Sequence, residues 1–252
     1  MDQQQATVKE NKLIAENIYA ITLTLQKSCN IKGGQFANIS VGDDKFPLKR
    51  PLGICKVIGK NITLCYQLKG EGTKRLSQAK IGDKLEVLLP LGNGFTIPEG
   101  AGHVAVIGGG VGIFPLISVI REHPDVNFHS YIGFRNKDAV CFLDEFVKGG
   151  SLVVTTDDGS FMQKGNAVSS FLNNVENVPA DMIIACGPPV MLKVLKEKLK
   201  ENNITKPCYV SLEERMGCGI GACLVCVCKK TDGSNARVCK DGPVFDINEV
   251  EL

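Results

Sequence analysis

The 252-residue sequence predicts an α/β plus all-β protein built from three consecutive parts. Short runs of alternating apolar residues fill the N-terminal part, and units of buried strand, glycine-rich loop and helix follow them. A group of cysteines marks the C-terminal part. We therefore expect an antiparallel β-barrel domain over residues 1–98, a doubly wound parallel-sheet domain over 99–208 and a small cysteine domain over 209–252.

The barrel is predicted from short strands that Gly, Asn, Asp and Pro interrupt. The expected strands span 18–25, 35–39, 51–57, 62–67 and 84–89. Helical periodicity is confined to a short piece at 74–78, and turn signals lie at 82–83 and 92–94. Strands of this length, without long amphipathic helices between them, are typical of a small closed barrel.

Two motifs in the barrel carry polar groups that suit a phosphate ligand. In Arg50-Pro51-Leu52-Gly53 a guanidinium able to grip a phosphate precedes a proline that fixes the entry of a strand. In Gly70-Glu71-Gly72-Thr73 glycine amides and a hydroxyl begin a short helical stretch, which suits a pyrophosphate. A hairpin turn explains the glycines as well as a ligand does, so neither motif decides the function alone.

The doubly wound domain is predicted from strands that alternate with helices. The apolar run 103–107 leads into Gly108-Gly109-Gly110-Val111-Gly112 and then a helix that ends near 122. Further strands are expected at 126–133, 151–155 and 182–186, with helices at 139–148, 166–173 and 189–202. Strand, glycine loop and helix together place amides and a helix N-terminus where a phosphate binds, although this loop departs from a strict G-x-G-x-x-G.

A second loop of this domain has the same layout. Cys186-Gly187-Pro188 follows a buried strand and precedes a helix, which places it at the carboxyl end of a parallel sheet, where ligands of open α/β folds bind. A tight turn with proline at the start of the helix is the alternative. The acidic pair Asp157-Asp158 would meet a ribose or amide, or would lie in a solvated turn.

The C-terminal cysteines predict an iron–sulfur site. Cys218, Cys223, Cys226 and Cys239 have the spacing C-x4-C-x2-C followed by one distant cysteine, which is the plant-type [2Fe–2S] pattern. Glycines around the first cysteine free the backbone to turn amide N–H groups toward sulfur. Structural zinc is the alternative, but it favours two short C-x2-C gaps. Cys228 would pack nearby, because a cluster has no position for a fifth ligand.

Composition narrows the class of protein. Hydrophobic residues make up 44% and charged residues 22%, and the net charge of +2 gives no case for nucleic-acid binding. The N-terminus lacks the pattern of a signal peptide, and no run approaches the roughly 18 apolar residues of a membrane span. Eleven cysteines outside a secretory context favour reduced thiols. We expect a cytoplasmic protein that binds neither membrane nor nucleic acid.

In order of motifs, residues 7–205 resemble the ferredoxin–NAD(P)+ reductase superfamily. There an Arg-Pro-x-Ser strand and a Gly-Thr or Gly-Ser turn bind FAD, while the glycine loop and a Cys-Gly turn bind the nicotinamide nucleotide. With the cysteine segment 218–228 and Val238-Cys239-Lys240-Asp241-Gly242-Pro243 added, the chain looks like one family within it, the electron-transfer subunits of NAD-dependent (class 1B) dihydroorotate dehydrogenases.

The resemblance implies a set of binding residues. For FAD these are Arg50, Pro51, Leu52, Gly53, Cys65, Tyr66, Gln67, Gly72 and Thr73. For the nicotinamide nucleotide they are Gly109, Gly110, Gly112, Cys186, Gly187 and Pro188. The cluster ligands are Cys218, Cys223, Cys226 and Cys239. Two positions depart from the family pattern, because Gly53 stands in place of Ser and Gln67 in place of Arg.

The resemblance also implies the reaction and its partner. The partner would be an FMN-containing dihydroorotate dehydrogenase catalytic subunit, and two copies of each chain would form a heterotetramer. In pyrimidine biosynthesis, electrons would pass from the FMN of that subunit through [2Fe–2S] and FAD to NAD+. FAD would connect the two carriers, since nicotinamide exchanges a hydride and the cluster single electrons. No general acid or base is expected, because the three histidines, His103, His123 and His129, are scattered in the sequence.

Three alternatives remain open at the level of sequence. Subunits of NADH-dependent ferredoxin:NADP+ reductases, sulfite reductases and soluble hydrogenases join the same modules. A zinc-stapled binding module without redox activity is a different class. The choice between NAD and NADP is also open, because Arg135, just after a strand, would either contact a 2′-phosphate or face solvent.

Overall fold

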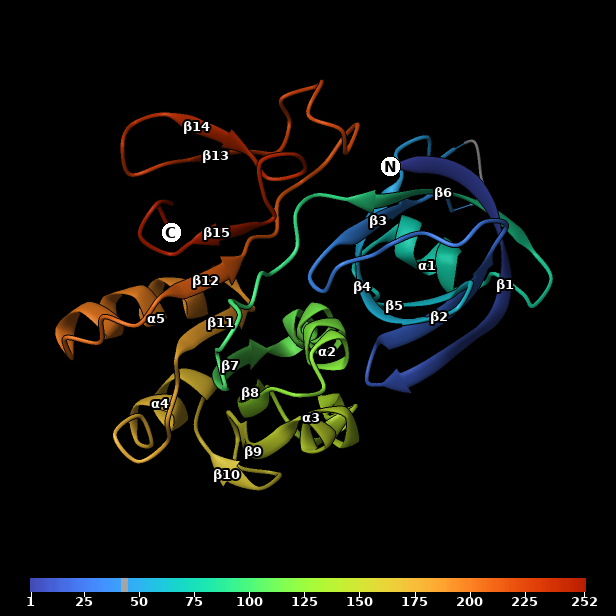
Figure 1. Ribbon diagram of the computed structural model, residues 1–252. Helices are drawn as coiled ribbons and strands as arrows, with labels where there is room; N and C mark the ends of the chain where they lie inside the picture. Colours follow the sequence, from blue (N-terminus) through green and yellow to red (C-terminus); the bar gives the residue numbers. More distant parts are fainter. Residues whose placement is uncertain (42–44) are drawn as a thin grey trace.

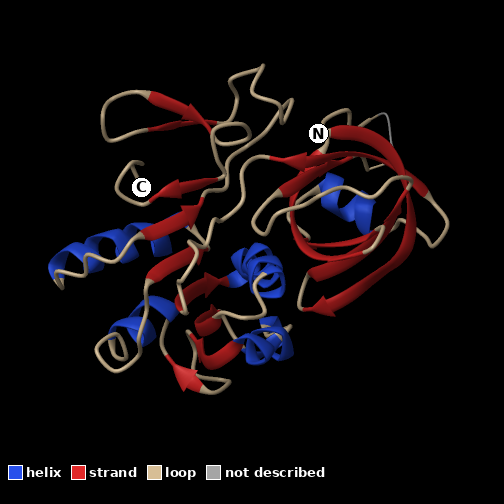
Figure 2. Ribbon diagram, viewed as in Figure 1, coloured by secondary structure: helices blue, strands red, loops and turns tan. Residues whose placement is uncertain are grey.

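The N-terminal part of the chain closes into a six-stranded antiparallel barrel (Figures 1 and 2). The computed structural model describes residues 1–41 and 45–252. Around the barrel the strands follow the order β1, β2, β5, β4, β3, β6, and α1 (Glu71–Ser77) precedes the last of them. The strands are β1 (Asp2–Ala15), β2 (Ile18–Leu25), β3 (Phe36–Ile39), β4 (Arg50–Ile58), β5 (Asn61–Gln67) and β6 (Lys84–Leu91).

The first strand is the one barrel element that the sequence pattern did not predict. β1 is rich in Gln, Lys and Glu, yet Gln4, Ala6 and Val8 alternate toward the barrel interior. Gln4 is tolerated there because its Oε1 accepts a hydrogen bond from the Lys27 amide at 2.9 Å. Pairing with both β2 and β6 makes β1 the closing strand, so tertiary contacts outweigh a weak local preference.

The second part is a mostly parallel sheet whose strands run in the order β10, β9, β8, β7, β11, β12, β15. Only the pairing of β12 with β15 is antiparallel. The strands are β7 (His103–Gly109), β8 (Asn127–Phe134), β9 (Gly150–Thr156), β10 (Gln163–Lys164), β11 (Met182–Cys186), β12 (Cys208–Ser211) and β15 (Val244–Asp246). Strand order reverses between β7 and β11, which is the switch point where doubly wound sheets bind ligands.

Helices cover both faces of this sheet, as the doubly wound prediction requires (Figure 1). One face packs against α2 (Ile113–Glu122) and α3 (Leu143–Gly149), and the other against α4 (Ala167–Leu172) and α5 (Pro189–Glu201). α3 begins later than the pattern at 139–148 suggested, because Phe142 takes a left-handed conformation with φ of 56° just before it. No helix of the described part of the chain is long and apolar enough to span a membrane.

The C-terminal segment packs on both earlier parts. It contains a small hairpin of β13 (Val227–Lys229) and β14 (Asn235–Arg237), and β15 then joins the large sheet beside β12. The expected boundary at 208/209 therefore falls within β12, and the cysteine segment shares the sheet of the preceding domain. Buried residues Cys226, Val238 and Cys239 belong to the same apolar cluster as α4 and α5.

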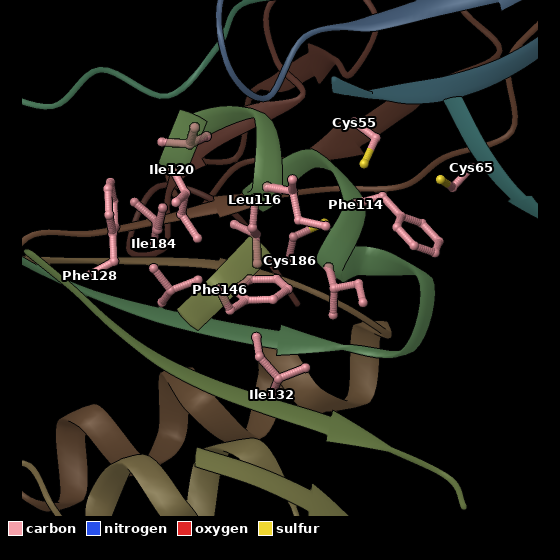
Figure 3. Close-up of a cluster of buried hydrophobic side chains, with 14 of the residues drawn as sticks. Cys55, Cys65, Phe114, Leu116, Ile120, Phe128, Ile132, Phe146, Ile184 and Cys186 are labelled. Atoms are coloured by element: carbon pink, nitrogen blue, oxygen red, sulfur yellow. The ribbon is translucent and has the colours of Figure 1, made fainter. Parts of the chain in front are cut away.

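A continuous apolar cluster joins the barrel to the sheet through α2 (Figure 3). Cys55 and Cys65, from barrel strands β4 and β5, lie in this cluster with Phe114 and Leu116 of α2. Helix α2 also packs directly on β4. The packing holds the glycine loop at the start of α2 against the strand that carries Arg50-Pro51-Leu52-Gly53.

Candidate functional site

The two glycine-containing loops of the parallel sheet meet at its switch point. A Cβ at Gly112 would come within 2.5 Å of the Cys186 carbonyl oxygen, and a Cβ at Gly109 would come within 2.7 Å of Met191 Sδ. Gly110 lies between them with φ of 53°, in the left-handed region that favours glycine. The glycines therefore allow close backbone contact, and they leave the amides of both loops at the carboxyl ends of β7 and β11.

The Cys186 thiol at this junction is a neutral group rather than a nucleophile. Its side chain is buried, and burial raises the pKa of Cys186 to about 12, although a hydrogen bond with Ser211 opposes that rise. The thiol stays protonated throughout the physiological range, so it can shape a ligand surface without reacting.

The two phosphate motifs of the barrel are brought together. The Arg50 guanidinium lies directly over Gly72 in the first turn of α1, where any side chain would overlap it. The adjacent Thr73 hydroxyl donates to the Gly70 carbonyl at 3.0 Å and accepts from the Lys69 amide at 3.0 Å. A cation and a row of amides converge there, which is the donor set that a pyrophosphate requires.

The structure explains why position 53 is a glycine. A Cβ at Gly53 would lie 2.6 Å from Pro115 Cγ, and Pro115 is held in the first turn of α2. The serine of the superfamily pattern would collide with this ring unless α2 moved. Glycine in place of serine at position 53 thus allows the close contact between the barrel and the nucleotide domain.

The segment 65–67 lies on β5 with two of its three side chains buried. Tyr66 points into the barrel core, where its hydroxyl donates to Asn11 Oδ1 at 3.0 Å, and burial raises its pKa. Cys65 faces the other way, into the cluster shared with Cys55. A ligand of this segment can therefore contact the strand backbone and the half-buried Gln67 side chain.

The four cysteines of the predicted cluster site converge as two pairs. The Cys218 amide donates to Cys223 Sγ at 3.3 Å, and the Cys239 amide donates to Cys226 Sγ at 3.4 Å. Gly221, which lies between Cys218 and Cys223 in the sequence, links the two pairs because its amide donates to Cys239 Sγ at 3.1 Å. Among residues 1–41 and 45–252, no three His, Cys, Asp or Glu side chains are placed to hold one metal ion. Two pairs of thiols fit a two-iron cluster better than a single zinc ion.

Backbone amides surround these sulfurs, as the glycines of the loop predicted. Ile220 and Ala222 donate to Cys218 Sγ at 3.4 and 3.3 Å. Desolvation opposes ionisation of Cys218, but these amides outweigh it and lower its pKa to about 6. The loop adopts left-handed conformations at Gly219 and Gly221, and also at Leu224, with φ of 59°. Cys218 is thus ready to bind as a thiolate.

The rest of the cluster segment is divided between core and surface. Cys228 packs against the apolar cluster that contains Cys226, which agrees with a packing role. Leu224 and Val225, between the ligands, are 63% and 56% exposed, so they point outward rather than into the core. An exposed apolar pair beside the cysteines suits contact with a partner.

Several residues that join the three parts were not predicted from the sequence. Asn93 anchors the segment after Cys239: its Oδ1 accepts a hydrogen bond from the Val244 amide at 3.0 Å, and its backbone N–H donates to the Gly242 carbonyl oxygen at 2.7 Å. Glu145, buried in α3, binds Lys56 of the barrel at 2.8 Å and Arg121 of α2 at 2.7 Å. Only the Gly-Asn-Gly turn around Asn93 left a signal in the sequence.

The ambiguous position Arg135 lies beside the acidic pair. Arg135, Asn136, Asp157 and Asp158 line a shallow pocket of about 320 Å³ at the carboxyl ends of β8 and β9. The Ser160 hydroxyl and amide donate to Asp158, which lowers the pKa of that carboxyl. Two carboxylates therefore share this pocket with one guanidinium.

The histidines are less scattered than expected. His103 and His129 stack with ring centroids 5.3 Å apart, and Nδ1 of His103 lies 3.0 Å from Nε2 of His129. They come together because they stand on the neighbouring strands β7 and β8. Both lie at the amino ends of the strands, opposite the two glycine-containing loops, so they take no part in the candidate site.

The barrel, the switch-point loops and the paired cysteines define a reductase of the flavin and iron–sulfur class, with the fold of ferredoxin reductases. The iron–sulfur cluster binding domain of dihydroorotate dehydrogenase B matches residues 213–251. The chain is 38% identical to the dihydroorotate dehydrogenase B (NAD+) electron transfer subunit of Streptococcus mutans, over 99% of this chain and 98% of that protein. It belongs to the family of these electron transfer subunits.

Two further comparisons agree with this family. The electron transfer subunit of the same name from Bacillus cereus is 40% identical over the full length of both chains. Among solved structures, that of an NADH-dependent reduced ferredoxin-NADP oxidoreductase superposes with a TM-score of 0.87 at 29% identity, covering 98% of this chain and 89% of that one. The domain match and the fold support the expected cofactors, FAD and an iron–sulfur cluster.

Proposed function

We propose that this chain is the electron-transfer subunit of an NAD-dependent dihydroorotate dehydrogenase and acts in pyrimidine biosynthesis. Membership of the family carries the proposal, together with the convergence of Cys218, Cys223, Cys226 and Cys239 in two pairs. In this proposal the chain contributes binding surfaces for the cofactors rather than a catalytic acid or base. Its partner is a catalytic subunit that contains FMN, and two copies of each chain form the assembly.

Each cofactor has its own set of residues in this proposal. FAD lies along Arg50-Pro51-Leu52-Gly53, the backbone of 65–67 and Gly72-Thr73, where Arg50 and the α1 amides bind its pyrophosphate. The nicotinamide nucleotide lies against Gly109, Gly110 and Gly112 and against Cys186-Gly187-Pro188 at the switch point. When bound, FAD exchanges electrons with nicotinamide in pairs and with the cluster singly.

The protein contributes position and environment to this reaction. Pro115 seats the start of α2 on Gly53, so the strand proposed for flavin and the loop proposed for nicotinamide are held in contact. The neutral Cys186 thiol and its apolar neighbours exclude water from that junction. The amides around Cys218 favour the thiolate that binds iron.

We propose NAD rather than NADP as the acceptor. Asp157 and Asp158 lie in the pocket with Arg135, and Asp158 is held ionised by Ser160. A 2′-phosphate would meet two negative charges there for one positive charge, whereas a 2′-hydroxyl can donate to a carboxylate. The free thiols of the described chain support a reducing compartment, so we place the reaction in the cytoplasm.

The decisive experiment reconstitutes the reaction. The purified chain, loaded with FAD and cluster, is mixed with the FMN-containing subunit that copurifies from native extract, and NADH formation from dihydroorotate and NAD+ is followed. We expect activity only when both chains are present. A copurifying ferredoxin or a sulfite-reducing partner, with no dihydroorotate activity, would refute the proposal. A colourless protein that contains zinc but neither iron nor flavin would refute the redox class itself.

A further inference from the structure

Asn38 lies on the barrel strand next to the proposed flavin strand. In β3, Ala37 and Ile39 point into the barrel core, so Asn38 between them points outward. Its register partner on β4 is Pro51, and antiparallel partners direct their side chains to the same face. Asn38 thus shares the outer barrel face with Pro51 and Gly53, where we place FAD.

The same side chain touches the cluster loop from the other side. Gly219, next to the ligand Cys218, has φ of 73°, and a Cβ built there would overlap Asn38 Nδ2. The same Cβ would lie 3.3 Å from Leu91 Cδ1, at the end of β6. The Asn38 carboxamide is therefore packed directly against the backbone that carries the first cluster ligand.

The carboxamide is buried but incompletely bonded. Asn38 is 1% exposed, and its Oδ1 has no hydrogen-bond partner among residues 1–41 and 45–252. A buried acceptor without a donor costs roughly 1–3 kcal/mol, so a native protein rarely keeps one without a ligand or a function. The other end of the carboxamide, Nδ2, faces the cluster loop at Gly219, where the sulfurs of a bound cluster would be hydrogen-bond acceptors.

We propose that Asn38 is a positioning residue that links the flavin-binding strand to the cluster loop and raises the reduction potential of the cluster. The inference rests on the proposed function. Packing of Nδ2 on Gly219 sets the position of the Cys218 backbone. The N–H end of the amide dipole also favours the added negative charge of the reduced cluster, because donors near sulfur raise cluster potentials.

The test compares Asn38→Leu, which keeps the size but removes the polar atoms, with the unchanged full-length chain loaded with FAD and cluster. Iron and FAD content are measured, and the cluster potential is determined by a redox titration followed by electron paramagnetic resonance. We expect the cluster potential to fall by about 59 mV, which is a tenfold change in the reduced-to-oxidised ratio of a one-electron couple. NADH oxidation by ferricyanide through FAD should persist.

A matched control and a second variant make the outcomes decisive. Ser130 on β8 is also 1% exposed, and its Oγ has no hydrogen-bond partner in the described part of the chain, so Ser130→Ala should leave the cluster potential unchanged. Asn38→Ala replaces Asn38→Leu if leucine does not fit. A lower potential, or loss of iron with FAD retained, supports the inference. An unchanged potential in a loaded variant, or loss of both cofactors in both variants, overturns it. An unmodified chain without flavin or cluster signals would instead refute the proposed function.

Discussion

Two sulfur-rich regions of the protein each contain a cysteine, Cys218 in one and Cys141 in the other, and the pKa values of these two thiols are shifted in opposite directions. In the cluster loop, Cys218 accepts hydrogen bonds from two backbone amides, and its pKa is lowered to about 6. Between the barrel and the nucleotide domain, Cys55, Cys65 and Cys141 lie together in an apolar cluster. There burial raises the pKa of Cys141 to about 12.

The difference lies in the backbone rather than in the cysteines. In the loop, left-handed glycines at 219 and 221 accompany the turn of the Ile220 and Ala222 amides toward Cys218 Sγ, which stabilises the Cys218 thiolate. In the interdomain region Cys65 stands on β5, whose amides pair with neighbouring strands, while Cys55 lies at a register shift of β4 and Cys141 in the loop before α3; all three thiols are buried among apolar side chains. Cysteines there behave as small apolar residues, whereas the cysteines that we propose as ligands lie where backbone amides reach sulfur.

The largest effect should separate cysteines that ligate from those that pack. Cys223→Ser is expected to remove the cluster and to abolish electron transfer to the partner, while FAD-dependent NADH oxidation by artificial acceptors is retained. Iron content and the two activities measure this division. Cys228→Ser is the matched control, since Cys228 packs on the core and should keep its iron. Loss of both activities in Cys223→Ser would contradict the division of labour.

The second prediction concerns thiol reactivity in the chain after removal of the cluster. At pH 7 a thiol with a pKa of about 6 is mostly thiolate, whereas one with a pKa of about 12 is almost fully protonated. We expect iodoacetamide to label Cys218 at least about 1000-fold faster than Cys141 or Cys186. Mass spectrometry of timed digests gives the rates, and the Cys218 rate should rise from pH 5 and level off above pH 7. Equal rates would show that the loop amides do not act on sulfur.

The third prediction tests the ionic link beside the interdomain thiols. Glu145→Gln leaves Lys56 and Arg121 without their buried carboxylate, and because both cations are partly exposed we expect a loss of about 2 kcal/mol in unfolding free energy. Desolvation opposes ionisation of Glu145, but its bonds to Lys56 and Arg121 lower its pKa. This stability is therefore present at neutral pH and is lost as the pH falls through the lowered pKa.

Urea unfolding at pH 7 and at pH 4 measures this link, and the difference in unfolding free energy between the variant and the unchanged chain should shrink on acidification. Asp144→Asn, one residue away on the exposed face of α3, serves as the control and should change stability by less than about 0.5 kcal/mol. Equal effects of the two substitutions would show that the buried link does not join the domains.

The smallest effect is expected for a thiol that only packs. Cys141→Ala removes one buried sulfur and should cost about 1 kcal/mol in unfolding free energy. Iron content, FAD content and NADH oxidation should be unchanged. A loss of flavin in this variant would mean that the interdomain thiols contribute to binding and do more than fill space.

The glycine and cysteine motifs were predictable because their chemistry is local. Gly219 and Gly221 sit within the ligand spacing itself, and the switch-point loops follow directly from buried strands that precede helices. β1 was missed because a strand rich in Gln and Lys has little local preference, and its partners β2 and β6 supply the pairing. The pair His103 and His129 was missed because residues 26 apart meet only through parallel register.

By itself, the sequence determined the barrel, the parallel sheet, the cysteine spacing and hence the family, because strand periodicity, glycine loops and ligand gaps are properties of neighbouring residues. Only the tertiary structure decided how these parts face one another. Pro115 over Gly53, Glu145 between Lys56 and Arg121, and Asn38 against Gly219 join residues from 24 to 181 positions apart. Such contacts arise from packing of whole domains, for which no local pattern of residues provides a signal.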